Sequence, residues 1–141
     1  MNSTTHFQSS HFDYVSNSLR RLCHNPPIIL SGLLSPGDRC IDVGCGSGFF
    51  TLEMAKIVGG NGKVYAVDTD SAMIQIATKA VHQAGFDDRV CMHCDDFLNI
   101  DFMDRIDFIL AFYVVHDFHH MDRFVGKIHN HLRANGKILI A

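Results

Sequence analysis

The glycine-rich stretch GCGSG, residues 44–48, directly follows a short apolar run, CIDV, and directly precedes a stretch with helical spacing of apolar residues. Glycine allows a tight turn and lets the backbone approach a ligand without a Cβ in the way. A loop between a strand and a helix is also where open parallel sheets bind their ligands. The stretch therefore indicates a loop that binds a cofactor.

The spacing of the glycines indicates which cofactor to exclude. A dinucleotide fingerprint requires G-x-G-x-x-G, but counting from Gly44 places Phe49 where the third glycine should stand. The third glycine is Gly48, which gives G-x-G-x-G and argues against NAD. No Gly-Lys-Ser/Thr follows the loop, so a triphosphate-binding loop is also disfavoured.

A cluster of histidines offers a second kind of chemistry. His116, His119 and His120 stand at i, i+3 and i+4, so on a helix they would share a face and could hold a metal, or one could act as a general base. The alternative, which we favour, is a helix start capped by Asp117 with exposed imidazoles. We predict no metal site here, and His116 remains the candidate for a catalytic or substrate-binding role.

The five cysteines do not form a recognisable framework. Cys91 and Cys94 flank His93, but residues three apart on a strand face opposite ways and cannot bind one ion together. An odd number of cysteines, mostly within apolar segments, suits reduced thiols and a cytosolic location. The set is Cys23, Cys40, Cys45, Cys91 and Cys94.

These residues are positioned by a regular alternation of strands and helices. Because strands separated by helices need crossover connections, the sheet is predicted to be parallel, in a Rossmann-like α/β/α fold of three layers with strand order 3-2-1-4-5. Helical spacing predicts helices over 49–58, from Asp70 to Gly85, and over 121–132. The predicted strands are 40–43, 63–67, 89–94, 107–112 and 137–141, the last after an Asn135-Gly136 turn.

The region before the glycine loop divides into two parts. Residues 1–10 are polar and without periodicity, so we expect a flexible arm. Residues 11–34 are expected to form a helical cap, with a helix from His11 to Cys23 ended by Asn25-Pro26-Pro27, and a short helix over 28–34. Residues 35–141 would then be the cofactor-binding domain.

Composition limits the partners of the chain. A length of 141 residues suits one domain, and a net charge of −3 without a basic run argues against nucleic acid. The longest apolar run, Phe108 to Val115, is far shorter than a membrane span, and the N-terminus does not look like a secretory signal. We expect a cytoplasmic protein with no membrane partner.

Beyond these arguments, the residues resemble a known family. CIDVGCGSGFFTLEMAK resembles motif I of the class I S-adenosylmethionine-dependent methyltransferases, and VYAVDTD, CDDF, DFILAFYVVHDF and LRANGKILIA resemble the segments that follow it in order. The resemblance covers roughly Asn25 to Ala141 and is closest to the small-molecule branch that includes ubiquinone-biosynthesis and arsenite methyltransferases. It implies S-adenosyl-L-methionine as the cofactor and in-line methyl transfer to a small-molecule acceptor.

The resemblance also implies roles for individual residues. Asp42 would lie near the methionine ammonium group, unless it only caps the glycine turn; Asp68 would hold the ribose hydroxyls, unless it only caps the next helix. Asp95 or Asp96 would accept from the adenine amino group. Thr69 and Phe97 would either flank the adenine ring or only pack in the core. Ala111 and Phe112 would lie between cofactor and substrate. The full set of implied cofactor contacts is Asp42, Gly44, Cys45, Gly46, Gly48, Asp68, Thr69, Asp95, Asp96, Phe97, Ala111 and Phe112.

The sequence departs from this family at its end. Members usually continue past the fifth strand with a helix and an antiparallel pair of strands, whereas this chain stops at Ile140-Ala141. The domain is therefore expected to be incomplete at its C-terminal side, unless something else covers the edge of the fifth strand. An open apolar edge predicts either a homo-oligomer formed through that strand or poor stability. This departure also leaves an alternative function open, a non-catalytic S-adenosylmethionine-binding domain with a regulatory or interaction role.

Overall fold

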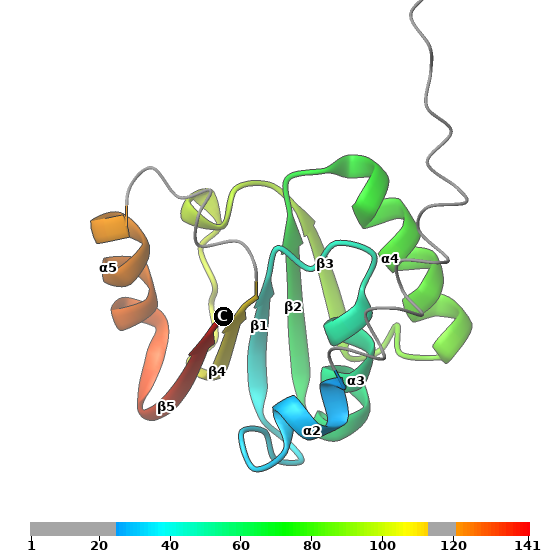
Figure 1. Ribbon diagram of the computed structural model, residues 1–141, viewed down its shortest axis with the longest axis horizontal. Helices are drawn as coiled ribbons and strands as arrows, with labels where there is room; N and C mark the ends of the chain where they lie inside the picture. The colour runs from blue at the N-terminus through cyan, green and yellow to red at the C-terminus, as the bar shows by residue number, and fades with distance from the viewer. Residues whose placement is uncertain (1–24, 113–120) are drawn as a thin grey trace, which may run out of the picture.

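The computed structural model describes residues 25–112 and 121–141, and these form a five-stranded sheet in the order β3-β2-β1-β4-β5 (Figure 1). Every neighbouring pair is parallel. The strands are β1 (Arg39–Val43), β2 (Lys63–Asp68), β3 (Val90–Cys94), β4 (Ile106–Ala111) and β5 (Leu132–Ile140). The predicted Rossmann-like fold and strand order are confirmed.

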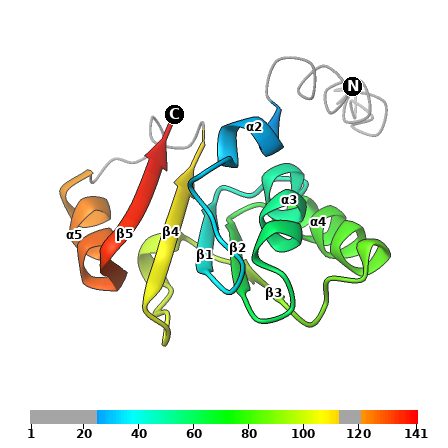
Figure 2. The same cartoon turned by 90° about the horizontal axis from the view of Figure 1, so that it is seen from below.

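The helices cover the two faces of the sheet (Figure 2). The face bearing α2, α3 and α4 has one apolar core, and the face bearing η1 and α5 has another. The helices are α2 (Pro26–Leu30), α3 (Phe49–Val58), α4 (Ser71–Ala84), the short 3-10 helix η1 (Phe97–Asn99) and α5 (Met121–His131).

The central strand β1 contributes to both cores because its side chains alternate between the two faces. Cys40 belongs to the core under α3, whereas Ile41 and Val43 belong to the core under α5. Asp42 occupies the alternating position on the α3 face, and it is a charged residue almost completely buried in the interior. The strand thus places one carboxylate where the pattern of the sheet calls for an apolar side chain.

Local signals explain where the helices begin and end. Asp70 caps α4 by accepting hydrogen bonds from the backbone N–H groups of Ala72 at 2.8 Å and Met73 at 3.4 Å. Gly85 ends the same helix in the left-handed conformation, with φ of 72°. Two consecutive prolines open α2, whose first turn tolerates a residue without an N–H. The short helix therefore spans Pro26–Leu30 rather than the predicted 28–34.

The start of β5 differs most from the prediction. The strand begins at Leu132 instead of Lys137, so the last predicted helix ends one residue earlier, at His131. Ile106 pairs with Leu132 and Phe108 with Lys137, which leaves the residues between Leu132 and Lys137 in an irregular, bulged register. The Asn135-Gly136 signal therefore marks this irregularity inside the strand rather than a turn before it. The strands β3 and β4 each differ from prediction by a residue at their ends.

The expected arm over 1–10, the expected helix from His11 to Cys23 and the segment 113–120 lie outside the described residues. Within 25–112 and 121–141, no helix is long and apolar enough to cross a membrane.

Candidate cofactor-binding site

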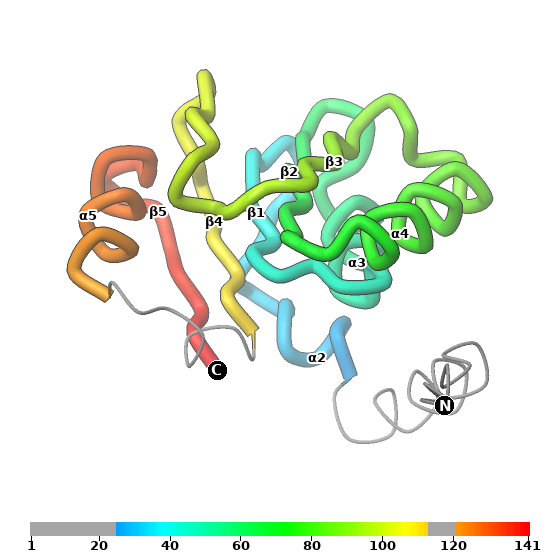
Figure 3. Tube along the Cα trace, turned by 90° about the horizontal axis from the view of Figure 1, so that it is seen from above, coloured from blue at the N-terminus to red at the C-terminus, as the bar shows by residue number. Residues whose placement is uncertain are grey.

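The predicted site residues converge because the strands are parallel and finish at the same end of the sheet, as their arrowheads in Figure 1 show. Seen from above, α3 and α4 lie on one side of the sheet and α5 on the other (Figure 3). In the sheet register Val43 lies beside both Val67 and Ala111, and Asp68 lies beside Cys94. The residues that follow these strands therefore leave the sheet together. This arrangement brings the glycine loop, Asp68 and Asp95 together at the carboxyl ends of the strands.

The glycine loop has the backbone that its sequence predicts. Gly44, Gly46 and Gly48 all have positive φ, at 72°, 53° and 88°, a region that residues with a Cβ rarely adopt. The N–H groups of Gly44 and Cys45 donate to the Val67 carbonyl at 2.8 and 2.9 Å, which fixes the loop against β2. A Cβ added to Gly46 would meet no atom within 4 Å, so the loop borders open space there.

Gly48 has a second reason to be glycine. An added Cβ would lie 3.3 Å from the Cβ of Ala77, closer than side chains normally approach. Ala77 is fully buried on α4, so the two small residues let the start of α3 pack against the middle of α4. This contact holds the end of the loop in place.

Asp68 is half-buried and connects the glycine loop to the following helix. Its Oδ2 accepts a hydrogen bond from the Gly46 N–H at 2.8 Å, and its Oδ1 accepts one from the Asp70 N–H at 2.9 Å. The cap of α4 is Asp70 rather than Asp68, so the helix-capping alternative for Asp68 is wrong. A carboxylate has about four lone-pair sites, so each oxygen keeps the capacity to accept a ribose hydroxyl.

Asp42 lies beneath the loop and is 2% exposed. Its Oδ2 accepts a hydrogen bond from the Thr51 hydroxyl at 2.6 Å, so its partner is in α3. Burial raises the pKa of Asp42 to about 6; the Thr51 hydrogen bond lowers it and the nearby Asp68 charge raises it. The site thus contains a buried carboxyl group that titrates just below neutral pH.

The structure separates Asp95 from Asp96, which the sequence could not. Asp96 caps η1 by accepting from the Leu98 N–H at 2.8 Å. Asp95 follows β3 directly and accepts from the Asn99 side-chain amide at 3.0 Å and the Asp96 N–H at 2.7 Å. These hydrogen bonds, Asn99 first, hold the pKa of Asp95 below its usual value. Asp95 is therefore the stronger candidate for the adenine amino group.

Two predicted contacts occupy different environments. Thr69 is exposed beside Asp68, whereas Phe97 is 3% exposed. The Phe97 ring lies 5.4 Å from Phe124 and 5.9 Å from Phe102, between centroids. This burial supports the packing alternative for Phe97.

The end of β4 forms the neighbouring wall of the site. Ala111 is completely buried, and the next residue, Phe112, is half-buried with its ring 4.8 Å from that of Phe50 in α3. His116, the catalytic candidate, lies outside the described residues, as do Asp117, His119 and His120.

Sequence reasoning missed Thr51 and Asn99, which hold two of the site carboxylates. Thr51 had a detectable signal, because it is the only polar residue among the five buried positions of α3: Phe50, Thr51, Met54, Ala55 and Val58. A hydroxyl on the buried face of a helix needs a hydrogen-bond partner. Asn99 carried no comparable signal, since it is exposed.

The hydrogen-bonding groups at the carboxyl ends of the strands fit S-adenosylmethionine. That cofactor carries an ammonium group, two ribose hydroxyls and an adenine amino group, all of which donate hydrogen bonds. The site offers the carboxylates of Asp42, Asp68 and Asp95, together with a glycine loop that borders open space at Gly46.

A comparison of sequences decides the family. Residues 34–141 match the methyltransferase domain family. The chain belongs to this methyltransferase family. S-adenosylmethionine is the cofactor of the class I methyltransferases that the chain resembles, and the resemblance inferred from the sequence motifs is confirmed.

Individual methyltransferases support the same conclusion. The chain is 27% identical over 129 residues to the ubiquinone/menaquinone biosynthesis C-methyltransferase of Teredinibacter turnerae, covering 91% of this chain and 51% of that protein. It is 37% identical over 65 residues to the 2-phytyl-1,4-naphtoquinone methyltransferase of Trichormus variabilis, covering 46% and 28%. The chain thus spans about half or less of these relatives.

Among solved structures, a methyltransferase from Aquifex aeolicus described as S-adenosylmethionine-dependent superposes with a TM-score of 0.82 at 26% identity, covering 95% of this chain and 72% of that one. The family and fold of the described domain are therefore established together.

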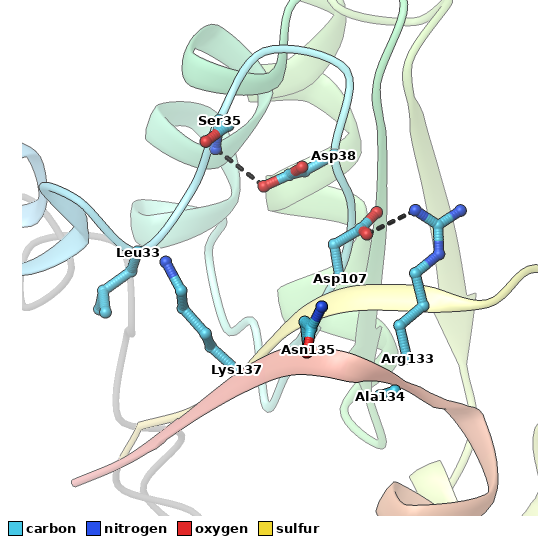
Figure 4. Close-up of a pocket in the computed structure, with 8 residues that line it drawn as sticks. All are labelled: Leu33, Ser35, Asp38, Asp107, Arg133, Ala134, Asn135 and Lys137. Atoms are coloured by element: carbon cyan, nitrogen blue, oxygen red, sulfur yellow. Dashed lines mark hydrogen bonds and ion pairs between the residues drawn. The ribbon is translucent and has the colours of Figure 1, made fainter.

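A cavity of about 480 Å³ lies elsewhere on the methyltransferase domain, beside the starts of β1, β4 and β5 (Figure 4). Its charged groups bind one another or the backbone. Arg133 contacts Asp107 at 2.6 Å, Asp38 accepts from the Ser35 N–H at 2.8 Å, and Lys137 donates to the Gly32 carbonyl at 2.9 Å. These contacts stabilise the starts of β1, β4 and β5.

Proposed function

We propose that the protein binds S-adenosylmethionine at the ends of β1, β2 and β3 and transfers its methyl group to a small-molecule acceptor. The observation that carries this proposal is the hydrogen bond from the Gly46 N–H to Asp68 Oδ2, at 2.8 Å. It joins the glycine loop to the strand-end acid, so this hydrogen bond fixes the position of the loop relative to the carboxylate. Such preorganisation reduces the entropy lost when a ligand binds.

Each carboxylate has a distinct proposed contact. Asp68 accepts the ribose hydroxyls, Asp95 accepts from the adenine amino group, and Asp42 supplies a negative charge to the amino-acid end of the cofactor. Asp42 is 2% exposed, so it acts from beneath the loop or through a water molecule. The glycine loop contributes backbone groups and leaves space for the ligand.

The cofactor, when bound, supplies a methyl group on a sulfonium, and the protein contributes alignment and electrostatics. The proposed wall between cofactor and acceptor is the end of β4, where Ala111 is buried and Phe112 packs against Phe50. This apolar wall suits exclusion of water from the transferring methyl group. His116 stays a sequence-based candidate for the acceptor side.

The acceptor class is proposed from the relatives. One is named a ubiquinone/menaquinone biosynthesis C-methyltransferase and another a 2-phytyl-1,4-naphtoquinone methyltransferase. We therefore place hydroxylated aromatic rings and quinols first among the acceptors to test. The apolar residues at the end of β4 are compatible with an aromatic acceptor.

The test is calorimetric titration of the protein with S-adenosylhomocysteine, followed by a methyl-transfer assay with labelled S-adenosylmethionine against small aromatic acceptors. Micromolar binding and transfer to one of them would support the whole proposal. Binding without transfer to any small acceptor would favour a non-catalytic binding domain. Absence of binding would contradict the proposed site.

We also propose self-association through β5 and a cytosolic location. β5 is the last strand of the described sheet, and Ile138 and Ile140 on it are 38% and 46% exposed. An exposed apolar edge strand can pair with a second copy of the same strand. Cys40, Cys45, Cys91 and Cys94 are free thiols, which supports a reducing compartment.

A further inference from the structure

The hydrogen bond between Thr51 and Asp42 lies at the boundary between α3 and the glycine loop. In the sheet register Asp42 has Ala66 on one side and Leu110 on the other, and both are apolar and fully buried. The residues paired with Asp42 on the neighbouring strands therefore donate no side-chain hydrogen bond to this carboxylate. Its side-chain partner is the Thr51 hydroxyl of α3, at 2.6 Å.

Thr51 uses its hydroxyl differently from the other threonine in a described helix. Thr78 in α4 donates to the carbonyl of Ile74, four residues earlier, at 2.7 Å, which is the usual local bond of a helical threonine. Thr51 instead donates across to β1. Thr51 is also completely buried, whereas Thr78 is exposed. The Thr51 hydroxyl is thus committed to the carboxylate rather than to its own helix.

The charges around Asp42 oppose its ionisation. Asp68, on β2, is a like charge, and burial itself penalises the carboxylate. Among the described residues, the other titratable groups that interact with Asp42 are the thiols of Cys40 and Cys45, and burial raises the pKa of both above their ordinary value. These thiols are neutral at physiological pH. Thr51 is the group that favours the charged form, through its hydroxyl and its backbone amide.

We propose that Thr51 is a positioning residue of the cofactor site, whose hydroxyl keeps the Asp42 carboxylate oriented and charged beneath the glycine loop so that it attracts the cationic amino group of the cofactor. The inference rests on the proposed function and deepens it. A charge held in a buried, low-dielectric position attracts an opposite charge more strongly than an exposed one. The hydroxyl therefore contributes to affinity without touching the cofactor.

The experiment compares the pH dependence of S-adenosylhomocysteine binding in four proteins, by calorimetry between pH 5 and pH 8. The wild-type affinity is expected to fall as the pH drops through about 6, where Asp42 becomes protonated. In Thr51→Val, which removes the hydroxyl but keeps the shape, the midpoint should move up by about one pH unit, because hydrogen bonds to charged groups are the stronger kind. The affinity should then be about fivefold weaker than wild type at pH 6 and nearly equal at pH 8.

Two variants serve as controls. Thr51→Ser keeps the hydroxyl and should keep the wild-type midpoint. Thr78→Val removes the matched threonine that bonds only within its own helix, and it should leave the midpoint unchanged. A role of Thr51 in packing alone would lower the melting temperature of Thr51→Val without moving the midpoint. That result, or an equal shift in either control, would overturn the inference.

A measurement without ligand separates this inference from the proposed function. The carboxyl carbon of Asp42 is followed by NMR through a pH titration of wild type and Thr51→Val. An upward shift of its midpoint in the variant supports the role of Thr51 even if the wild type binds no S-adenosylhomocysteine, in which case the cofactor proposal alone fails. An unchanged midpoint rejects the role of Thr51. If Thr51→Val does not fold, Thr51→Ala provides the same comparison.

Discussion

The backbone N–H of Gly46 donates to Asp68 Oδ2 at 2.8 Å, so the loop after the first strand and the acid at the end of the second strand form one unit. The second carboxylate oxygen of Asp68 bonds the Asp70 N–H, which extends this unit to the start of α4. One side chain thereby joins the glycine loop, the end of β2 and the start of α4. A substitution of Asp68 should consequently weaken cofactor binding more than a substitution of any other acid at a strand end.

Asp68→Ala is expected to weaken S-adenosylhomocysteine binding by about 10- to 100-fold, because hydrogen bonds to a charged group typically contribute 1.5–3 kcal/mol. Calorimetry measures the loss directly. The matched control is Asp70→Ala, which removes the cap of α4 and should cost about 1 kcal/mol of stability while leaving the affinity nearly unchanged. Equal losses of affinity in the two variants would contradict the assignment of Asp68.

Asp42→Asn should make the unliganded protein more stable at pH 7 and weaken cofactor binding. Folding raises the pKa of Asp42 from 3.8 to about 6. This shift means that the charged carboxylate lowers the free energy of unfolding by about 3 kcal/mol at neutral pH. The folded state holds the proton more tightly than the unfolded state, so stability from this group is present at pH 4 and is lost as the pH rises to about 6.

Urea denaturation at pH 5 and pH 7 tests this expectation, since the wild type should lose stability between these values through Asp42 and Asp42→Asn should lose less. A variant less stable than wild type at pH 7 would show that the buried charge is fully compensated by its hydrogen bonds.

Gly48→Ala should destabilise the protein beyond the strain of its positive φ. The added methyl group would lie 3.3 Å from the Cβ of Ala77 and push α3 away from α4. Gly85 is a matched control, because it has the same left-handed conformation, with φ of 72° and ψ of 34°, but an added Cβ there meets nothing within 4 Å. We expect Gly48→Ala to cost about 1 kcal/mol more than Gly85→Ala in the free energy of unfolding.

A double-mutant cycle with Ala77→Gly checks the cause, since removal of the facing methyl group should recover part of the loss. If the effects of the two substitutions on the free energy of unfolding are purely additive, the contact with Ala77 does not cause the loss of stability in Gly48→Ala.

Ile138→Lys on the exposed face of β5 should reduce self-association. A lysine on an edge strand opposes pairing with a second copy, whereas an apolar residue allows it. Light scattering coupled to size-exclusion chromatography gives the mass of wild type and variant. Val125→Lys is the control, because Val125 is 53% exposed on α5 rather than on the strand edge. A monomeric wild type, or the same effect from both variants, would argue against the edge as the interface.

The sequence predicts the fold well because its alternation of strands and helices leaves few possible topologies. The order 3-2-1-4-5 and the glycine loop are confirmed, and Asp70 and Gly85 bound α4 as their residue types indicate. The early start of β5 was not predictable, since its pairing of Leu132 with Ile106 depends on the neighbouring strand rather than on local propensity.

The candidate site was predictable to the level of its acids but not of their partners. The family resemblance identified Asp42 and Asp68, whereas the hydrogen bond to Thr51 joins residues nine positions apart through the fold. Periodicity predicted the helix over 49–58 that contains Thr51, but the buried position of Thr51 and its partner came from the structure. The roles of Asp95 and Asp96 separated only when the structure showed which one caps η1.

The central position of β1 has a consequence for the order in which the chain folds. Its contacts with β2 join residues about two dozen positions apart, as in the bond from Cys40 to Lys63, separated by 23 residues, whereas the bond from Arg39 to Asp107 spans 68. Short loops close with a smaller entropy loss than long ones, so the unit of β1, α3 and β2 is the natural early structure. The half of the sheet that carries the glycine loop can thus form before β4 and β5 add to it.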